Sequence, residues 1–258
     1  MTLRPFSVTC FHHALLPSVL LLSAVQVHAE TVCADPPFDS PEPIARVVEA
    51  TSEAISGFAG LEMTLSSAIR EICIADKLHA ARGYFEPEAR RIVLAPDLEG
   101  GLPEAVMVHE LRHAEQYALG LCPSLSLAMR DYAQAIFAME ADASVASLVV
   151  AARLKESGND SMWEAISRWP MQSDVAAAFE TRLEETDSLS QAAQAGFDAW
   201  FANEQRTDVY YVSSCLDYLD RTEEAHLLPQ YDRVAPEFLD QLCTLPDGTP
   251  YQCALPED

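Results

Sequence analysis

Apolar residues recur at helical spacing through most of the chain. The pattern is strongest in an alanine-rich stretch from about Leu125 to Lys155, in which Glu140 and Asp142 are the only charged residues between Asp131 and Arg153. Apolar positions three and four residues apart are typical of an amphipathic or buried helix. The same spacing predicts further helices over residues 44–58, 103–120, 161–169, 175–185, 189–203 and 207–220.

A short region ahead of residue 103 instead indicates β-structure. Residues 81–85 and 90–95 are rich in aromatic and β-branched side chains, and a Pro-containing connection joins them. This pattern predicts a β-hairpin. The segment 65–74 fits a helix or a strand equally well. The predicted fold class is therefore α+β, mainly α, with a small β-hairpin ahead of the helix at 103–120.

The two ends of the chain differ from this central region. Residues 1–29 combine Arg4, an apolar stretch and the cleavage-type sequence Val27-His28-Ala29, which predicts a signal peptide and a mature chain beginning at Glu30. The apolar stretch is too short to span a bilayer as a helix. We expect a Pro-rich acidic lead-in over 30–43, one domain over 44–226 and an irregular, Cys-containing tail over 227–258. The mature protein is then periplasmic or secreted, with no membrane span.

Cysteine usage agrees with export. Six cysteines follow the predicted signal peptide, namely Cys33, Cys73, Cys122, Cys215, Cys243 and Cys253. An even number in an oxidising compartment predicts up to three disulfides and no free thiol, with the connectivity open. Cys243 and Cys253 flank the turn sequence Pro246-Asp247-Gly248, which favours a local bridge. The alternative is six buried free thiols.

Net charge limits the possible partners. The sequence contains 40 acidic and 16 basic residues, for a formal net charge of −24. Such a surface argues against nucleic acid and against anionic membranes as partners. It favours cationic substrates, although a dispersed acidic surface also serves solubility alone.

The most specific motif is His109-Glu110-Leu111-Arg112-His113. Residues four apart lie on one helix face, so both histidines can approach a single metal ion. Glu110 is rotated by about 100° from His109, which suits a general base beside the ion. The alternative is a surface helix that carries two histidines by coincidence.

A third ligand is needed, because catalytic zinc is usually held by three protein ligands. Gln116 and Leu119 stand where the metzincin pattern requires Gly and His, so that subclass is excluded. Glu140 projects from an apolar helix face, where an ionised carboxylate needs a cation or another partner. Glu140 is therefore the predicted third ligand, with His226 or His79 as alternatives. Asp142 lies about 200° away on the same helix, where it orients a ligand or faces solvent.

The paired motifs His109-Glu110-x-x-His113 and Glu140-Ala141-Asp142-Ala143 resemble zincin metallopeptidases of the gluzincin type. More narrowly, they resemble a bacterial family of putative metallopeptidases with H-E-L-R-H and E-A-D-A helices. The resemblance covers residues 81–144 and implies a zincin-like domain that binds Zn²⁺. It also implies that one strand of the hairpin pairs with an extended peptide or protein substrate, the alternative being a purely structural ribbon. Arg112 departs from many peptidase motifs, whose middle positions are uncharged.

These observations favour an exported zinc-dependent metallopeptidase, with His109, His113 and Glu140 as metal ligands and Glu110 as the catalytic base. Candidates for stabilising the oxyanion are Tyr210, Tyr211 and His226, although aromatic residues at helical spacing are more often part of the core. The main alternative is an exported zinc-containing binding protein without catalytic activity. A third hypothesis is an envelope interaction protein that binds no metal.

Overall fold

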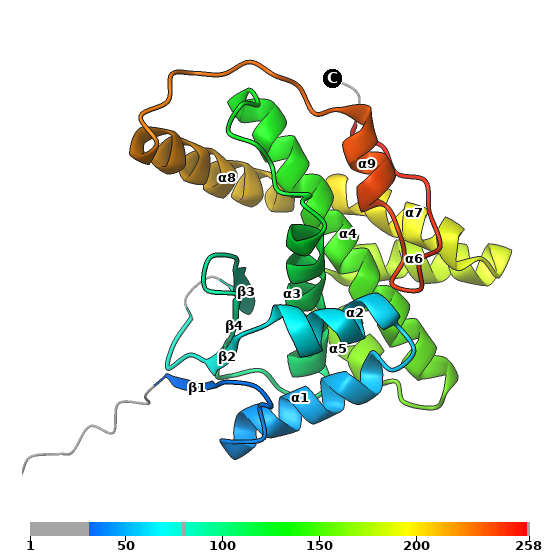
Figure 1. The fold of residues 1–258 in the computed structure, drawn as a ribbon. Helices are drawn as coiled ribbons and strands as arrows, with labels where there is room; N and C mark the ends of the chain where they lie inside the picture. Colours follow the sequence, from blue (N-terminus) through cyan, green and yellow to red (C-terminus); the bar gives the residue numbers. More distant parts are fainter. Residues whose placement is uncertain (1–30, 79–80, 257–258) are drawn as a thin grey trace, which may run out of the picture.

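The structure is a computed structural model that describes residues 31–78 and 81–256 (Figure 1). The predicted signal peptide and the alternative ligand His79 lie outside the described residues. Within them, the protein is mainly helical with one small mixed sheet, as the sequence predicts. The helices are α1 (Glu42–Ala54), α2 (Ala59–Met63), α3 (Leu102–Ala118), α4 (Met129–Glu156), α5 (Ser161–Arg168), α6 (Ser173–Thr186), α7 (Leu189–Phe201), α8 (Glu204–Glu224) and α9 (Pro236–Leu242).

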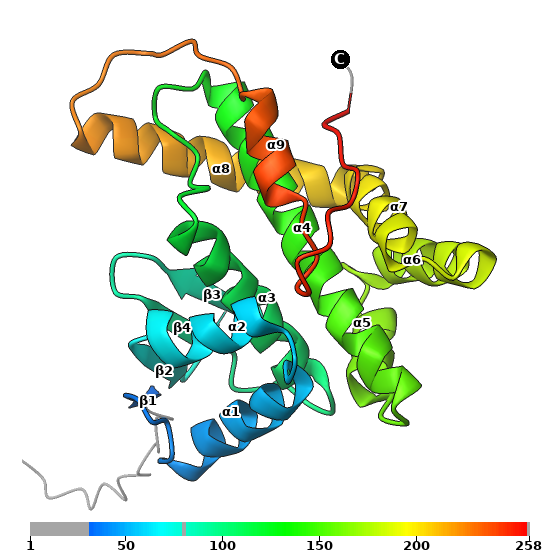
Figure 2. The same cartoon turned by 45° about the vertical axis from the view of Figure 1, so that its right-hand side comes forward.

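Helix α4 runs through the middle of the molecule. The sheet and α1–α3 lie on one side of it and α6 and α7 lie on the other, as both views show (Figures 1 and 2). Among the described residues, α4 is long and apolar enough to cross a membrane, but 83% of its most apolar window is buried inside the protein. Burial on nearly all sides explains why so few charged residues occur along this helix.

The sheet has the strand order β1-β2-β4-β3. Its strands are β1 (Val32–Ala34), β2 (Glu71–Ile74), β3 (Gly83–Glu86) and β4 (Arg91–Leu94). Strands β3 and β4 form the predicted antiparallel hairpin, whereas β2 pairs with β4 in parallel. The sheet packs on α3. Its edge strand β3 borders the cleft described below, which residues of α3 also line.

The ambiguous segment 65–74 contains both kinds of structure. A π-helical turn ends at Ala68, and the strand β2 begins at Glu71. The main-chain N–H of Arg70 donates to the carbonyl of Arg90 at 2.8 Å, which starts the pairing of β2 with β4. The segment changes from helix to strand because a partner strand is present there, and local periodicity does not contain that information.

The C-terminal tail, expected to be irregular, contains the short helix α9. Pro236 occupies its first turn, where the missing N–H costs nothing, and Leu242 is fully buried against the core. Tertiary packing therefore stabilises a helix that local sequence signals alone do not predict. The rest of the tail has no regular secondary structure up to residue 256.

Two disulfides form among the described residues. Cys243–Cys253 is the predicted local bridge, and Cys33–Cys73 joins β1 to β2. The prediction of no free thiol is wrong, because Cys122 and Cys215 are unpaired. Cys122 lines the cleft described below, which one side of α8 also borders. Cys215 belongs to α8 itself and lies about 200° around this helix from Asp217, which faces the cleft. The two thiols are consequently on different sides of this helix.

Candidate metal centre

The helix that carries the histidine motif begins and ends where the sequence predicts. Pro103 lies in the first turn of α3, and Gly120 follows its end with a φ of +78°, a conformation that favours glycine. One side of α3 packs into the core through Met107, Leu111 and Ala114. The opposite side presents His109, Glu110 and His113 to a cleft.

Three predicted ligand residues come together on the floor of this cleft. The Nε2 atoms of His109 and His113 are 3.1 Å apart. Glu140 approaches from α4, with its carboxylate oxygens 3.2 Å from Nε2 of His109 and 3.4 Å from Nε2 of His113. The potential ligand atoms of these residues all lie within 4.8 Å of one another. The alternative ligand His226 is exposed beyond the end of α8 and does not line the cleft.

The ligand group attracts positive charge. Burial alone would lower the pKa of His113, but Glu140, Glu110 and Gln116 together outweigh it and raise that pKa to about 9. Burial would raise the pKa of Glu140, but the two histidines hold it well below its usual range. Two imidazole nitrogens and a carboxylate therefore converge on a point where a proton or a metal cation is favoured.

Glu110 lies beside this group rather than within it. Its side chain is buried, and burial raises its pKa, although the neighbouring histidines act in the opposite direction. The carboxylate accepts a hydrogen bond from the main chain of Phe85 on β3. It is also close to Gly83, where a Cβ atom would lie 2.6 Å from Val106 Cγ1 and 3.4 Å from Glu110 Oε1. Glycine at this position lets the strand approach α3 closely.

Gln116 orients one of the histidines, a role that the sequence analysis did not assign. Its Nε2 donates to Asp142 Oδ2 at 2.7 Å and to the Met139 carbonyl at 3.1 Å. With both amide hydrogens used, its Oε1 accepts from Nδ1 of His113 at 2.9 Å. The Nδ1 proton is then held by Gln116, and Nε2 is the ring nitrogen that faces Glu140 and His109 and that a metal ion or a second proton would occupy. The position of Gln116, three residues after His113 on the same helix face, was the available signal.

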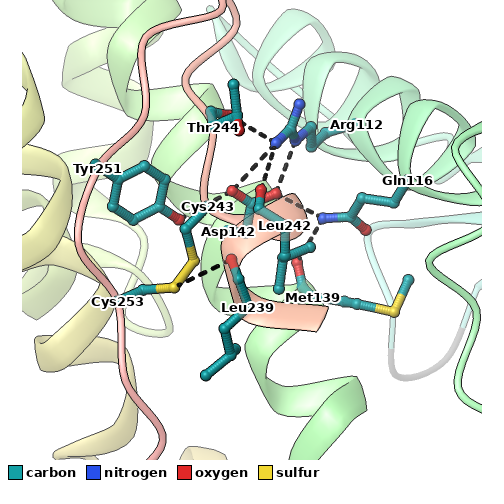
Figure 3. The surroundings of a disulfide bond; sticks show 10 residues. All are labelled: Arg112, Gln116, Met139, Asp142, Leu239, Leu242, Cys243, Thr244, Tyr251 and Cys253. Carbon is teal, nitrogen blue, oxygen red and sulfur yellow. Dashed lines mark hydrogen bonds and ion pairs between the residues drawn. A yellow bond between two sulfur atoms is a disulfide. The ribbon is translucent and has the colours of Figure 1, made fainter. Parts of the chain in front are cut away.

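Asp142 and Arg112 form a buried pair behind the site (Figure 3). Asp142 is 1% exposed, and it accepts from Arg112 Nε at 2.7 Å and from Tyr251 Oη at 2.9 Å. Asp142 was predicted either to orient a ligand residue or to face solvent. It is buried, and it contacts His113 only through Gln116, an arrangement that agrees with the first role. Arg112, the departure from peptidase motifs, points away from the ligand group and into this pair.

The cleft has a volume of about 990 Å³ and is bounded by β3 on one side and α8 on the other. Tyr210 of α8 lies in the cleft, where its hydroxyl bonds to Glu140. Burial and the Glu140 carboxylate raise the pKa of Tyr210 well above its ordinary value, so the phenol keeps its proton. Tyr211 is 43% exposed and does not line the cleft. Of the three oxyanion candidates, only Tyr210 is therefore placed at the site.

The free edge of β3 faces the same cleft. The Ala95 N–H donates to the Arg82 carbonyl at 2.8 Å, and main-chain hydrogen bonds in an antiparallel pair involve alternate residues. The main-chain groups of Gly83 and Phe85 consequently point away from β4. Because Gly83 and Phe85 both line the cleft, this edge offers the main-chain groups of Gly83 and the carbonyl of Phe85 to a bound molecule, while the Phe85 N–H is used by Glu110.

Comparison with known proteins gives one relationship. Residues 27–253 match the family model described as "Putative metallopeptidase family (DUF6782)". No curated protein and no solved structure matches the chain.

Proposed function

The chain belongs to this putative metallopeptidase family, and on that premise we propose that it is an exported zinc-dependent peptidase with a zincin-like domain. The observation that carries the proposal is the convergence of His109, His113 and Glu140 on one point, with the buried carboxylate of Glu110 beside them. A binding site for metal alone needs the three ligands. It has no need of a second acidic group with a raised pKa beside them, whereas hydrolysis does.

The geometry of the donor set supports zinc. In a tetrahedral zinc site with bonds of about 2.0–2.1 Å, neighbouring ligand atoms are about 3.3 Å apart. The two Nε2 atoms are 3.1 Å apart, and they lie 3.2 and 3.4 Å from the two carboxylate oxygens of Glu140. Two imidazoles and one carboxylate also form a ligand set that catalytic zinc uses, with one position left for water or substrate.

The residues of the site suit peptide hydrolysis. Zinc, when bound, supplies Lewis-acid activation of a water molecule and of the scissile carbonyl. Glu110 accepts a proton from the attacking water and delivers it to the leaving amine, and its raised pKa favours this exchange near neutral pH. Tyr210, which keeps its proton, would turn its O–H from Glu140 toward the negative charge that develops on the carbonyl oxygen.

The shape of the cleft supports an extended peptide as the substrate. The outward main-chain groups of Gly83 and the carbonyl of Phe85 can pair with a peptide backbone as an added strand. Pairing of this kind reads the backbone rather than particular side chains, so it suits a peptide or protein substrate of varied sequence. The net charge of −24 favours cationic substrates over acidic ones.

Glu110→Gln tests the catalytic proposal. We expect zinc content and folding to remain unchanged, because Glu110 is outside the ligand group, and activity on a peptide library to fall by roughly 100- to 10,000-fold. The matched control is Glu104→Gln, which changes another partly buried carboxylate of α3 that lies outside the cleft. Undiminished turnover by Glu110→Gln, with a chelator control, would contradict the proposed chemistry.

The main alternative is a non-catalytic, exported zinc-containing binding protein. It predicts one zinc per chain, lost in His113→Ala and Glu140→Ala, together with no cleavage of any library peptide by the wild-type protein. Absence of zinc from protein purified without chelators would instead contradict both hypotheses and leave an interaction protein without metal.

The two disulfides are typical of proteins that fold in an oxidising compartment. We therefore propose that residues 1–29 direct export and are removed, and that the mature protein is periplasmic or secreted. Intact-mass measurement of the exported protein should give a chain that begins at Glu30. A mass that still includes residues 1–29 would contradict this part of the proposal.

A further inference from the structure

The C-terminal loop closed by the Cys243–Cys253 disulfide contacts the buried pair behind the candidate metal centre. Arg112 Nη2 donates to the carbonyls of Leu242 at 3.0 Å and Thr244 at 2.7 Å, on either side of Cys243. From the other end of the loop, Tyr251 Oη donates to Asp142 Oδ1 at 2.9 Å. Figure 3 shows the loop, the disulfide and both charged residues together.

These contacts continue to a metal ligand. Asp142 accepts from Gln116, and Gln116 accepts from Nδ1 of His113. Asp142 and Gln116 are both almost fully buried, so water does not compete for these hydrogen bonds. A displacement of Tyr251 or of the loop would therefore change the hydrogen bonds that hold Gln116, and with them the orientation of the His113 ring.

The disulfide holds the loop in this position. The N–H of Tyr251 donates to the Cys243 carbonyl at 3.0 Å, and that of Leu245 donates to the Thr249 carbonyl at 2.8 Å. A cross-link between Cys243 and Cys253 restricts the freedom of the intervening residues and keeps Tyr251 next to Asp142.

We propose that the disulfide-closed C-terminal loop is a positioning element for metal ligand His113, acting through Tyr251, Asp142 and Gln116. The proposal rests on the proposed function to the extent that His109, His113 and Glu140 bind a metal ion. It assigns Tyr251 a positioning role, since this residue does not line the cleft. Outer hydrogen-bond partners of metal ligands typically change metal affinity by about 10- to 100-fold.

Tyr251→Phe is the first test. The ring packs against Phe197 and is kept, while the hydroxyl that reaches Asp142 is removed. We expect the dissociation constant for zinc, measured by competition with a chromophoric chelator, to rise about 10-fold. The Co²⁺-loaded variant should also show an altered visible absorption spectrum, because that spectrum reports the ligand geometry directly.

Tyr218→Phe is the matched control. Tyr218 is also a buried tyrosine, but its hydroxyl donates to the Leu127 carbonyl and not to Asp142. The control should lose some thermal stability and keep the wild-type zinc affinity and Co²⁺ spectrum. Equal zinc affinity in Tyr251→Phe and the wild-type protein would overturn the positioning role.

The two disulfides provide the second test. Cys243→Ala/Cys253→Ala should weaken zinc binding about 10-fold, whereas Cys33→Ala/Cys73→Ala should leave it unchanged, because that bridge joins β1 to β2 outside the cleft. Equal losses in both double variants would show a general effect of stability and overturn the proposal. A wild-type protein that binds no metal would instead contradict the proposed function itself, so the two failures are distinguishable.

Discussion

Asp142→Ala is the perturbation whose effect the structure defines most closely. The carboxylate is 1% exposed and accepts hydrogen bonds from Arg112, Gln116 and Tyr251. Arg112 is itself 3% exposed, so its guanidinium cannot exchange the lost partner for water. The variant therefore leaves a buried cation with only the Glu115 carboxylate and two main-chain carbonyls.

The expected magnitude follows from this burial. Removal of one partner of a buried ion pair costs about 3–5 kcal/mol of folding free energy. In a domain of this size each kcal/mol lowers the melting temperature by about 2–4 °C, so the expected decrease is about 6–20 °C. The matched control is Asp97→Ala, because Asp97 is 71% exposed in its ion pair with Arg82 and should contribute no more than about 1 kcal/mol.

The assay is thermal unfolding followed by circular dichroism, with a chelator present so that metal binding does not contribute. The single variant Arg112→Met and the double variant Arg112→Met/Asp142→Ala complete a mutant cycle with Asp142→Ala. The double variant should lose less stability than the sum of the single variants, because neither member of the pair is then buried without the other. A decrease of less than about 3 °C for Asp142→Ala, or strict additivity in the cycle, would refute the buried-pair argument.

Three further predictions follow from the site and the cysteines. In protein freed of metal by a chelator, the raised pKa of His113 stabilises the fold fully below pH 6.5, and this stabilisation is lost as the pH rises toward 9. The lowered pKa of Glu140 stabilises the fold above about pH 4.5, and this stabilisation is lost in acid. The melting temperature of the metal-free protein should thus be highest between these limits, and a flat profile from pH 6.5 to 9 would contradict the interaction. Thiol titration of the denatured, unreduced protein should find two equivalents, Cys122 and Cys215, and zero or six equivalents would contradict the disulfide assignment. Gly83→Ala should cost about 1–3 kcal/mol, measured by chemical denaturation, because its Cβ would collide with α3, and an unchanged midpoint would show that the strand can move away.

Local patterns along the sequence were enough to predict the main elements and to select the candidate ligand residues. Spacing of apolar residues placed α3 and α4 to within a few residues, and the β-hairpin ahead of α3 was predicted from its composition and turn. His109, His113 and Glu140 could be selected because helical spacing fixes the two histidines on one face and because a lone carboxylate on an apolar face needs a partner. Backbone periodicity is a local property, so the order of residues is enough to reveal it.

The surroundings of these residues could not be predicted from local patterns, because they depend on tertiary packing. Arg112 is a charged residue at a middle position of the motif, and its pairing with Asp142 forms only because α3 and α4 pack together. The choice of Tyr210 over Tyr211 depends on which side of α8 faces the cleft. The same orientation places Cys122 and Cys215 on different sides of α8, so they do not pair. The contact between Tyr251 and Asp142 joins residues 109 positions apart. Burial and hydrogen-bond partners come from the packing of distant segments, and local spacing in the sequence does not specify that packing.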